Sequence, residues 1–370
     1  MIFKNHQYWM AQAIRLAEKG IYTTRTNPRV GCVIVKDDEV LGQGFHAYPG
    51  QPHAEINAIQ DAQGTDLTGS TVYVTLEPCA HTGKTPPCVN AILNVKPKKV
   101  VIAMQDPNPL VSGKSIEQLK QHGIEIIVGV LEQQAFALNP GFIKRMSSQL
   151  PYVRLKMAMS LDGKTALKNG LSEWISGKQS RQDVQYLRAR SCAIISGINT
   201  VLADDPSLNV RLTMQELGLD QEIQQPIRVV LDSKLQMPLN AKMLHIPGET
   251  WVFSCHKDVR KIALLEAKNC RVFIQGRRDS LDLQQVMEAL AKEGINEVHT
   301  ECGSRLAGSL LNKQLVDEVI IYIAPKLLGA QAMGLVDFGE LTQMDQALNI
   351  NVKNVTQIGA DIKLQCQPLY

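Results

Sequence analysis

The 370-residue chain lacks the features that accompany several common functions. Aromatic residues make up only 5% of it and the formal net charge is +3, so it has neither the stacking surface nor the basic field that nucleic-acid binding uses. No apolar run approaches the ~20 residues that span a bilayer, and the N-terminus has no signal-peptide core. We therefore expect a cytoplasmic protein that binds neither nucleic acid nor a membrane.

Eight cysteines are too few for a disulfide framework in a chain of this length. In a reducing compartment, paired cysteines are more often metal ligands. The length exceeds that of one typical core, which predicts two domains. Residues 147–151 are small and polar and end in proline, so we expect a linker there between domains at 1–147 and 151–370. The sequence leaves homo-oligomerisation open.

Strands and helices alternate in the first half, which is typical of a three-layer α/β/α domain. Hydrophobic patterning predicts strands at 30–35, 40–44, 71–76, 98–104 and 124–128. It predicts helices at 8–18, 54–62, 88–93 and 115–121.

Three candidate metal ligands fall at the boundaries of these elements. His53 precedes a helix, Cys79 follows a strand and Cys88 begins another helix. Helix N-termini lower thiol pKa values, and metal binding needs thiolates. Three protein ligands leave the fourth position of a zinc ion open for water, as in catalytic sites. Glu55 lies two residues after the histidine and is available to move protons, as in the H-x-E…P-C-x-x-C deaminases, although here eight residues separate the cysteines.

Two other hypotheses remain open at this point. His81 lies between the cysteines, so a closed Cys2His2 site in a zinc-stabilised binding module is compatible with the spacing. Glu55 would then have no role. A deaminase that acts on a flipped nucleic-acid base is disfavoured by the low aromatic content and the small net charge.

The cysteine spacing itself matches a known family. Residues 77–88 read EPCAHTGKTPPC, and together with HAE at 53–55 and NPRVG at 27–31 they closely resemble the bifunctional riboflavin-biosynthesis deaminase-reductases. The resemblance covers about residues 6–368. It implies a cytidine-deaminase-like N-terminal domain with one Zn²⁺, and a pyrimidine ribosyl phosphate held by Asn27, His46 and Lys84.

The second half is also α/β, and its clearest ligand signal is ECGSRL at residues 301–306. A strand ends there, a glycine turn follows, and a helix begins with Ser304 as its candidate N-cap. Exposed N–H groups at such a turn favour an anion. By itself this is a weak signal.

Three further segments resemble the reductase half of the same family, which has the dihydrofolate-reductase fold: KMAMSLDG at 156–163, SEWI at 172–175 and GINTVLADDP at 197–206. One departure is Cys302, where the family often has glycine. The resemblance implies NADPH contacts from Ala158, Trp174, Thr200, Asp204, Ser233, Gly303, Ser304, Arg305 and Leu306. It implies substrate contacts from Ser172, Arg188, Leu208, Arg211 and Glu301.

Two of these residues, Arg188 and Arg211, suit a phosphate, because each arginine can donate two parallel hydrogen bonds to it.

The resemblance of both halves implies zinc-dependent hydrolytic deamination of 2,5-diamino-6-ribosylamino-4(3H)-pyrimidinone 5-phosphate. NADPH-dependent reduction of ribosyl to ribityl would follow and give 5-amino-6-ribitylamino-uracil 5-phosphate. The alternative is a single-function zinc nucleoside or tRNA deaminase with an accessory binding domain.

Overall fold

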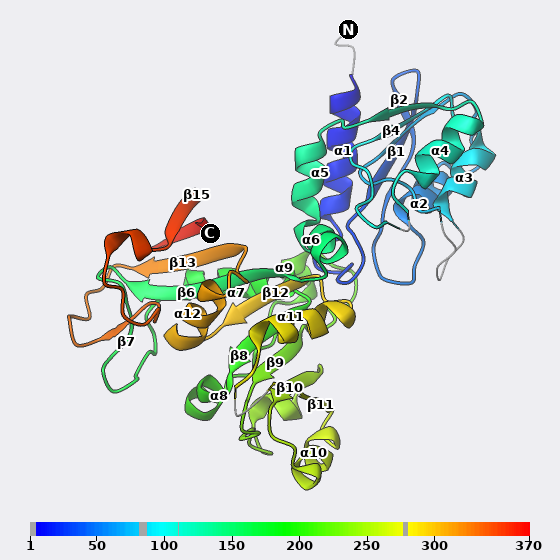
Figure 1. Cartoon of the computed structure of the whole chain (residues 1–370). Coiled ribbons are helices and arrows are strands. Elements are labelled where there is room, and N and C mark those ends of the chain that lie inside the picture. Colours follow the sequence, from blue (N-terminus) through cyan, green and yellow to red (C-terminus); the bar gives the residue numbers. More distant parts are fainter. Residues whose placement is uncertain (1–4, 81–86, 110, 277–279) are drawn as a thin grey trace. The chain divides into compact units, whose positions relative to one another are not determined.

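The computed structural model describes residues 5–80, 87–109, 111–276 and 280–370, and the chain forms two compact units, Met1–Gln149 and Leu150–Tyr370 (Figure 1). Within these described ranges, no helix is long and apolar enough to cross a membrane. Ser147 and Ser148 belong to a helix, so the linker expected at 147–151 is shorter than predicted. Both hydroxyls donate to Lys144 or Ile143 carbonyls within that helix, which lets serine continue it.

The first unit is built on a five-stranded sheet in the order β2-β1-β3-β4-β5. β1 is antiparallel to β2 and β3, whereas β3, β4 and β5 are parallel. The strands are β1 (Gly31–Lys36), β2 (Glu39–Phe45), β3 (Thr71–Val74), β4 (Lys99–Ile102) and β5 (Glu125–Val128). The helices are α1 (His6–Glu18), α2 (Ala54–Asp61), α3 (Cys88–Val95), α4 (Lys114–Gln121), α5 (Glu132–Leu138) and α6 (Pro140–Ser148).

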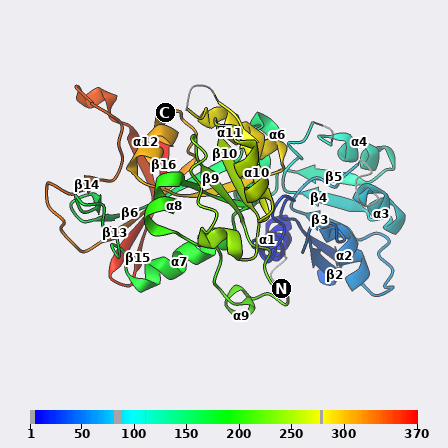
Figure 2. The same ribbon diagram turned by 90° about the horizontal axis from the view of Figure 1, so that it is seen from below.

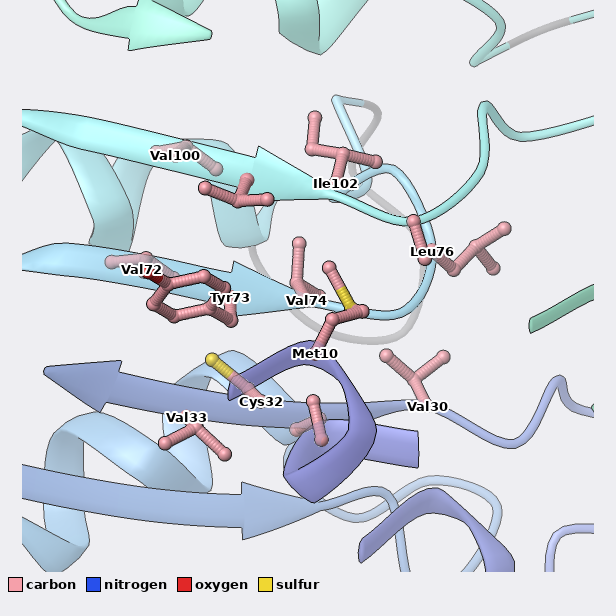
Figure 3. Packing of buried hydrophobic residues seen from close by; sticks show 14 of the residues in the cluster. Met10, Val30, Cys32, Val33, Val72, Tyr73, Val74, Leu76, Val100 and Ile102 are labelled. Atoms are coloured by element: carbon pink, nitrogen blue, oxygen red, sulfur yellow. The ribbon is translucent and has the colours of Figure 1, made fainter. Parts of the chain in front are cut away.

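Helices cover both faces of this sheet, which confirms the three-layer α/β/α prediction (Figure 1). Two glycines allow the close approach. A Cβ at Gly31 would lie 2.0 Å from the Ala13 carbonyl oxygen of α1, and one at Gly42 would lie 2.2 Å from the Ala58 carbonyl oxygen of α2. Figure 3 shows the core, where Met10 of α1 packs on buried residues of the sheet.

The second unit is built on a nine-stranded sheet in the order β11-β10-β9-β8-β12-β6-β13-β16-β15. The strands from β11 to β13 are parallel, and the β15–β16 hairpin adds antiparallel to β13. The bounds are β6 (Tyr152–Ser160), β8 (Ala193–Gly197), β9 (Ile227–Leu231), β10 (Thr250–Ser254), β11 (Cys270–Ile274), β12 (Glu297–Glu301), β13 (Glu318–Ala324), β15 (Asn349–Ile358) and β16 (Asp361–Leu369). A separate small ladder joins β7 (Lys164–Ala166) to β14 (Met333–Gly334).

Helices also cover both faces of the second sheet, with α7 and α8 on one side and α11 and α12 on the other (Figure 2). The helices are α7 (Lys178–Ala189), α8 (Ile198–Asp204), α9 (Met214–Leu217), α10 (Val259–Glu266), α11 (Leu283–Lys292) and α12 (Ser304–Asn312), with 3-10 turns η1 (Lys242–His245) and η2 (Met344–Gln346). The short α9 was not predicted, although Thr213 closes a capping box there with Glu216.

A buried ion cluster crosses three strands of this sheet. Arg154 of β6 is 2% exposed and donates to Glu297 of β12 and Glu318 of β13. Glu297 is itself 2% exposed. A charge this deeply buried is tolerated only with its counter-charges in place.

We predict that Glu297→Gln lowers the free energy of unfolding by about 3–5 kcal/mol, because it leaves the Arg154 charge buried with one carboxylate fewer. The matched control is Glu293→Gln, which removes the same group from an exposed pair. Its partner Arg271 is 51% exposed and Glu293 itself 36%, so the loss should stay below about 1 kcal/mol. Urea denaturation of the full chain measures both. Equal losses would contradict the argument.

Candidate functional site

Three metal-ligand side chains meet at one edge of the first sheet. Cys79 follows β3, Cys88 is the first residue of α3, and His53 immediately precedes α2. Their ligand atoms all lie within 4.8 Å of one another. The Nδ1 atom of His53 is 3.2 Å from the Cys88 sulfur and 3.6 Å from the Cys79 sulfur. One imidazole and two thiols are a donor set that suits zinc.

The electrostatics of the cluster favour a thiolate at Cys79, whereas the hydrogen bond to Cys79 and burial raise the pKa of the Cys88 thiol. The Cys88 backbone N–H donates to the Cys79 sulfur over 3.2 Å. Hydrogen bonds from the Cys88 side chain and from His53 lower the pKa of the Cys79 thiol to about 4. Since metal ligation requires deprotonated sulfur, the surroundings prepare this side chain for a cation.

Glu55 lies in the first turn of α2, beside the ligands but outside the ligand cluster of the described residues. Its side chain is buried, at 4% exposure. Burial, followed by the nearby Cys79 sulfur, raises the pKa of Glu55 to about 7. A carboxyl group in such surroundings exchanges protons readily near neutral pH.

A pocket opens beside the cluster and brings together residues from distant parts of the first unit. Asn27 and His46, which flank the β1–β2 hairpin, are joined by a 3.0 Å hydrogen bond between the Asn27 amide and Nε2 of His46. The Pro52 carbonyl accepts from Nδ1 of the same ring, so Nε2 is the acceptor. Burial lowers the pKa of His46 and favours its neutral form. The pocket is lined by Asn27, Pro28, Val30, His46, His53, Glu55, Leu76, Glu77, Cys79 and Asp106.

Two of the predicted residues lie outside the described ranges. These are Lys84, the third substrate contact implied by the resemblance, and His81, the fourth ligand of the alternative closed site. Sequence reasoning missed Glu77 and Asp106, which line the pocket. The EPC triplet at the end of a strand was a signal for Glu77, whereas Asp106 follows β4 with no distinctive pattern.

In the second unit, Glu301 ends β12 and is paired with Arg188 of α7. The guanidinium donates to both carboxylate oxygens, at 2.5 and 2.9 Å, and to the Asn209 carbonyl at 2.8 Å. Although burial acts in the opposite direction, Arg188 holds the pKa of Glu301 well below its usual range. Arg188 was expected to grip a phosphate with two parallel bonds, and its paired N–H groups are instead held by Glu301.

The other implied substrate residues lie on the segment that carries Asn209. Leu208 is 2% exposed, and the Arg211 backbone N–H donates to Gln185 of α7. Burial and the positive charge of Arg188 lower the pKa of Arg211, so the two arginines lie close enough to repel each other. An anion bound between them would relieve that repulsion.

Lys156 of β6 lies opposite Glu301 in the register of the parallel β6–β12 ladder. Burial lowers the pKa of its ammonium group, which lies 6.0 Å from the centre of the Tyr322 ring.

Most of the residues implied in NADPH binding lie near or just after the carboxyl ends of parallel strands, which meet at one edge of a sheet. Ala158 lies on β6, Thr200 and Asp204 on α8 after β8, and Ser233 after β9. Residues 303–306 follow β12, so Gly303, Ser304, Arg305 and Leu306 fall at the start of α12. The Ser196 hydroxyl of β8 donates to the Glu301 carbonyl, which joins two of these strand ends.

The start of α12 differs from the prediction in one respect. Its N-cap is Gly303, with φ −78° and ψ 172°, and Ser304 is the first helical residue. A Cβ at Gly303 would meet nothing within 4 Å, so open space adjoins the helix N-terminus. The first N–H groups of a helix have no partner within it, so a helix N-terminus beside open space is a suitable place for an anion.

Trp174 and Ser172 lie on the segment between β7 and α7. The Trp174 ring is 62% exposed, Arg181 stacks on it at 4.5 Å, and Lys326 donates to its carbonyl at 2.7 Å. Burial and the negative charge of Glu173 raise the pKa of Asp204.

Two different protein families match the two structural units of the chain. Residues 3–104 match the cytidine and deoxycytidylate deaminase zinc-binding region, and residues 151–364 match the RibD C-terminal domain. The riboflavin biosynthesis protein RibD of Escherichia coli is 44% identical over 97% of this chain and 98% of its own length. The C-terminal match excludes a single-function deaminase with an accessory binding domain as the overall description.

Solved structures agree. Acinetobacter baumannii RibD, form 1, superposes with a TM-score of 0.91 at 44% identity and covers 99% of each chain. A Thermotoga maritima protein, described as a diaminohydroxyphosphoribosylaminopyrimidine deaminase / 5-amino-6-(5-phosphoribosylamino)uracil reductase, gives 0.86 at 33% identity, covering 98% of this chain and 99% of its own. The fold is thus a cytidine-deaminase-like domain followed by a RibD reductase domain, both α/β.

These matches show both activities of the enzyme and its small-molecule substrate. It deaminates 2,5-diamino-6-ribosylamino-4(3H)-pyrimidinone 5-phosphate hydrolytically with Zn²⁺, and then reduces ribosyl to ribityl with NADPH. The chain therefore belongs to the RibD family of bifunctional deaminase-reductases of riboflavin biosynthesis.

Proposed function

We propose that His53, Cys79 and Cys88 hold the zinc ion of the deaminase and that Glu55 is its proton carrier. The observation that carries this proposal is the meeting of one Nδ1 and two sulfur atoms within 4.8 Å, with a buried carboxyl group beside them. Three protein ligands leave one position for the reaction, which fits catalysis better than a closed structural site.

In the proposed mechanism, the pyrimidinone enters the pocket with its 2-amino carbon towards the ligand cluster. A zinc ion held by His53, Cys79 and Cys88 would supply Lewis-acid activation of the water molecule that attacks this carbon. Glu55 takes a proton from the water and delivers it to the departing amino group, which leaves as ammonia. Asn27 and His46, whose ring centroid lies 5.2 Å from that of His53, hold the substrate ring, and Lys84 contributes a further substrate contact.

For the reductase we propose that the carboxyl edge of the second sheet binds both reactants. Ala158, Thr200 and Asp204 contact NADPH together with Trp174, Ser233 and the 303–306 turn, and the helix N-terminus there faces a phosphate. Ser172, Leu208 and Arg211 contact the sugar phosphate. Arg188 acts mainly through Glu301, whose two oxygens it fixes. NADPH supplies the hydride for C1 of the sugar.

We further propose that residues 1–147 are the deaminase domain and residues 151–370 the reductase domain. Low aromatic content and near-neutral charge support an enzyme without a nucleic-acid partner, and eight free cysteines suit the reducing cytoplasm. The edge strand β15 is exposed along nearly all its length and offers unpaired backbone groups to a second copy. Light scattering of the purified chain tests this proposed homo-oligomer.

The variant Glu55→Gln should retain one zinc ion per chain and lose deamination by roughly 10²–10⁴-fold, because the amide cannot accept the proton of the water. Metal analysis and ammonia release measure the two quantities. NADPH oxidation with the deaminated intermediate is the internal control and should not change. A variant that has lost its zinc would instead make Glu55 a ligand.

Cutting the chain between Gln149 and Leu150 should give two separately folding pieces, because each has its own hydrophobic core. The N-terminal piece should release ammonia without NADPH, and the C-terminal piece should reduce the deaminated intermediate. Circular dichroism and the two assays check this. An inert or insoluble N-terminal piece would show that its core needs the second unit.

The order of the two reactions is predicted to be fixed. The two substrates differ where an exocyclic amine becomes a carbonyl, and a site that hydrogen-bonds one of these leaves buried groups unpaired with the other. Arg211 would contact the common sugar phosphate and cannot discriminate between them. Cys88→Ser, which removes a proposed ligand, should therefore block NADPH oxidation when the diamino compound is supplied.

The same Cys88→Ser protein should oxidise NADPH normally with the deaminated intermediate, which serves as the control for folding. Spectrophotometry at the NADPH absorbance band follows both reactions. Consumption of NADPH with the diamino compound at the wild-type rate would refute a fixed order.

A further inference from the structure

Glu77 is a buried carboxylate that neither proposed mechanism uses. It follows β3, two residues before Cys79, and its side chain is 3% exposed. One oxygen, Oε2, accepts from the backbone N–H of Asp106 at 3.2 Å and of Gly113 at 3.0 Å. The other, Oε1, accepts from the N–H and the hydroxyl of Ser115 at 3.2 and 2.9 Å.

These four bonds occupy the lone-pair positions that a carboxylate offers, which number about four. Glu77 therefore has little capacity left for a metal or a substrate. The four donors belong to Asp106 and Gly113, on the connection from β4 to α4, and to Ser115 in the first turn of α4. The Glu77 backbone N–H also donates to the Met104 carbonyl at the end of β4. Both its backbone and its side chain thus join the Cys79 segment to this connection.

The connection matters because one of its residues, Asp106, forms part of the pocket wall. Asp106 lines the same pocket as Glu55 and His53, and is 7% exposed. Its Oδ1 atom accepts from the Asn108 backbone N–H at 2.8 Å, which fixes the direction of the carboxylate. The Asp106 backbone is in turn fixed by Glu77. A shift of the connection would therefore move the wall against which a substrate ring lies.

We propose that Glu77 is a positioning residue of the deaminase, which through its bonds to Asp106, Gly113 and Ser115 holds Asp106 in the wall of the substrate pocket, while its own chain leads to the Cys79 ligand. This inference rests on the proposed deaminase site. Glu77 acts through the pocket wall, so its loss weakens substrate binding more than it slows the chemical step.

The test compares Glu77→Met with Glu77→Gln in the full chain loaded with zinc. Met has nearly the same shape but accepts none of the four bonds, so the KM for deamination should rise roughly tenfold or more, with kcat less affected. Zinc content should remain one per chain. NADPH oxidation with the deaminated intermediate should be unchanged, because that site lies in the other unit.

Glu77→Gln is the conservative variant that should restore binding. Its amide oxygen can face the Asp106 and Gly113 N–H groups, and its NH2 group can donate to the Ser115 hydroxyl. Only the Ser115 N–H then lacks its partner, so KM should stay within about threefold of the wild type. A KM for the Met variant that equals the wild-type value, with zinc retained, overturns the proposal. Loss of zinc from both variants also overturns it, because Glu77 would then support the ligands.

If the Glu77→Met variant does not fold, the variant Ser115→Ala tests the positioning role of Glu77. It removes one of the four bonds and should raise KM by roughly threefold, with zinc and kcat retained. An unchanged KM overturns the proposal. Failure of the proposed deaminase site is distinguishable, since it would appear as full deamination by Glu55→Gln, whatever the KM values of the Glu77 and Ser115 variants.

Discussion

Neighbouring parallel strands end at the same edge of a sheet, and the proposed sites of both units depend on this constraint. In the first unit, β3 leads to Cys79 and β4 leads to Asp106, and α2 and α3 begin at the same edge. In the second unit, β12 ends at Glu301, opposite Lys156 of β6 and close to the end of β8. Residues far apart in the sequence converge because the backbone ladder aligns the strand ends.

Burial then determines which interactions the charged side chains at these strand ends can make. A carboxylate at a strand end needs donors or a counter-charge, and Glu301 obtains one from Arg188. The same guanidinium cannot give both of those bonds to a phosphate. Sequence alone could indicate that arginine suits phosphate. It could not show that α7 passes over β12 and brings Arg188 to Glu301, because that contact joins residues 113 positions apart.

The sequence predicted the sheet-and-helix pattern well where apolar runs were short and bounded by turns, as in β1 to β5. The sequence also indicated that His53, Cys79 and Cys88 form one group of ligands, because element boundaries and the chemistry of the donor atoms are local properties. It was wrong where two local signals competed. Serines at 147 and 148 resembled a linker yet continue α6, and Ser304 resembled an N-cap although Gly303 occupies that position. The partners of Glu77 depend on a loop that begins 29 residues later.

Glu55 and Glu77 line the same pocket, but their carboxyl groups have different surroundings. Each lies two residues from a proposed zinc ligand, and each is almost fully buried. Four donors occupy the oxygens of Glu77, so its side chain fixes the backbone at Asp106, Gly113 and Ser115. Glu55 is buried without such a set of neutral donors, and its pKa rises to about 7. These different surroundings support the proposed roles, proton transfer for Glu55 and positioning for Glu77, although both residues have the same side chain.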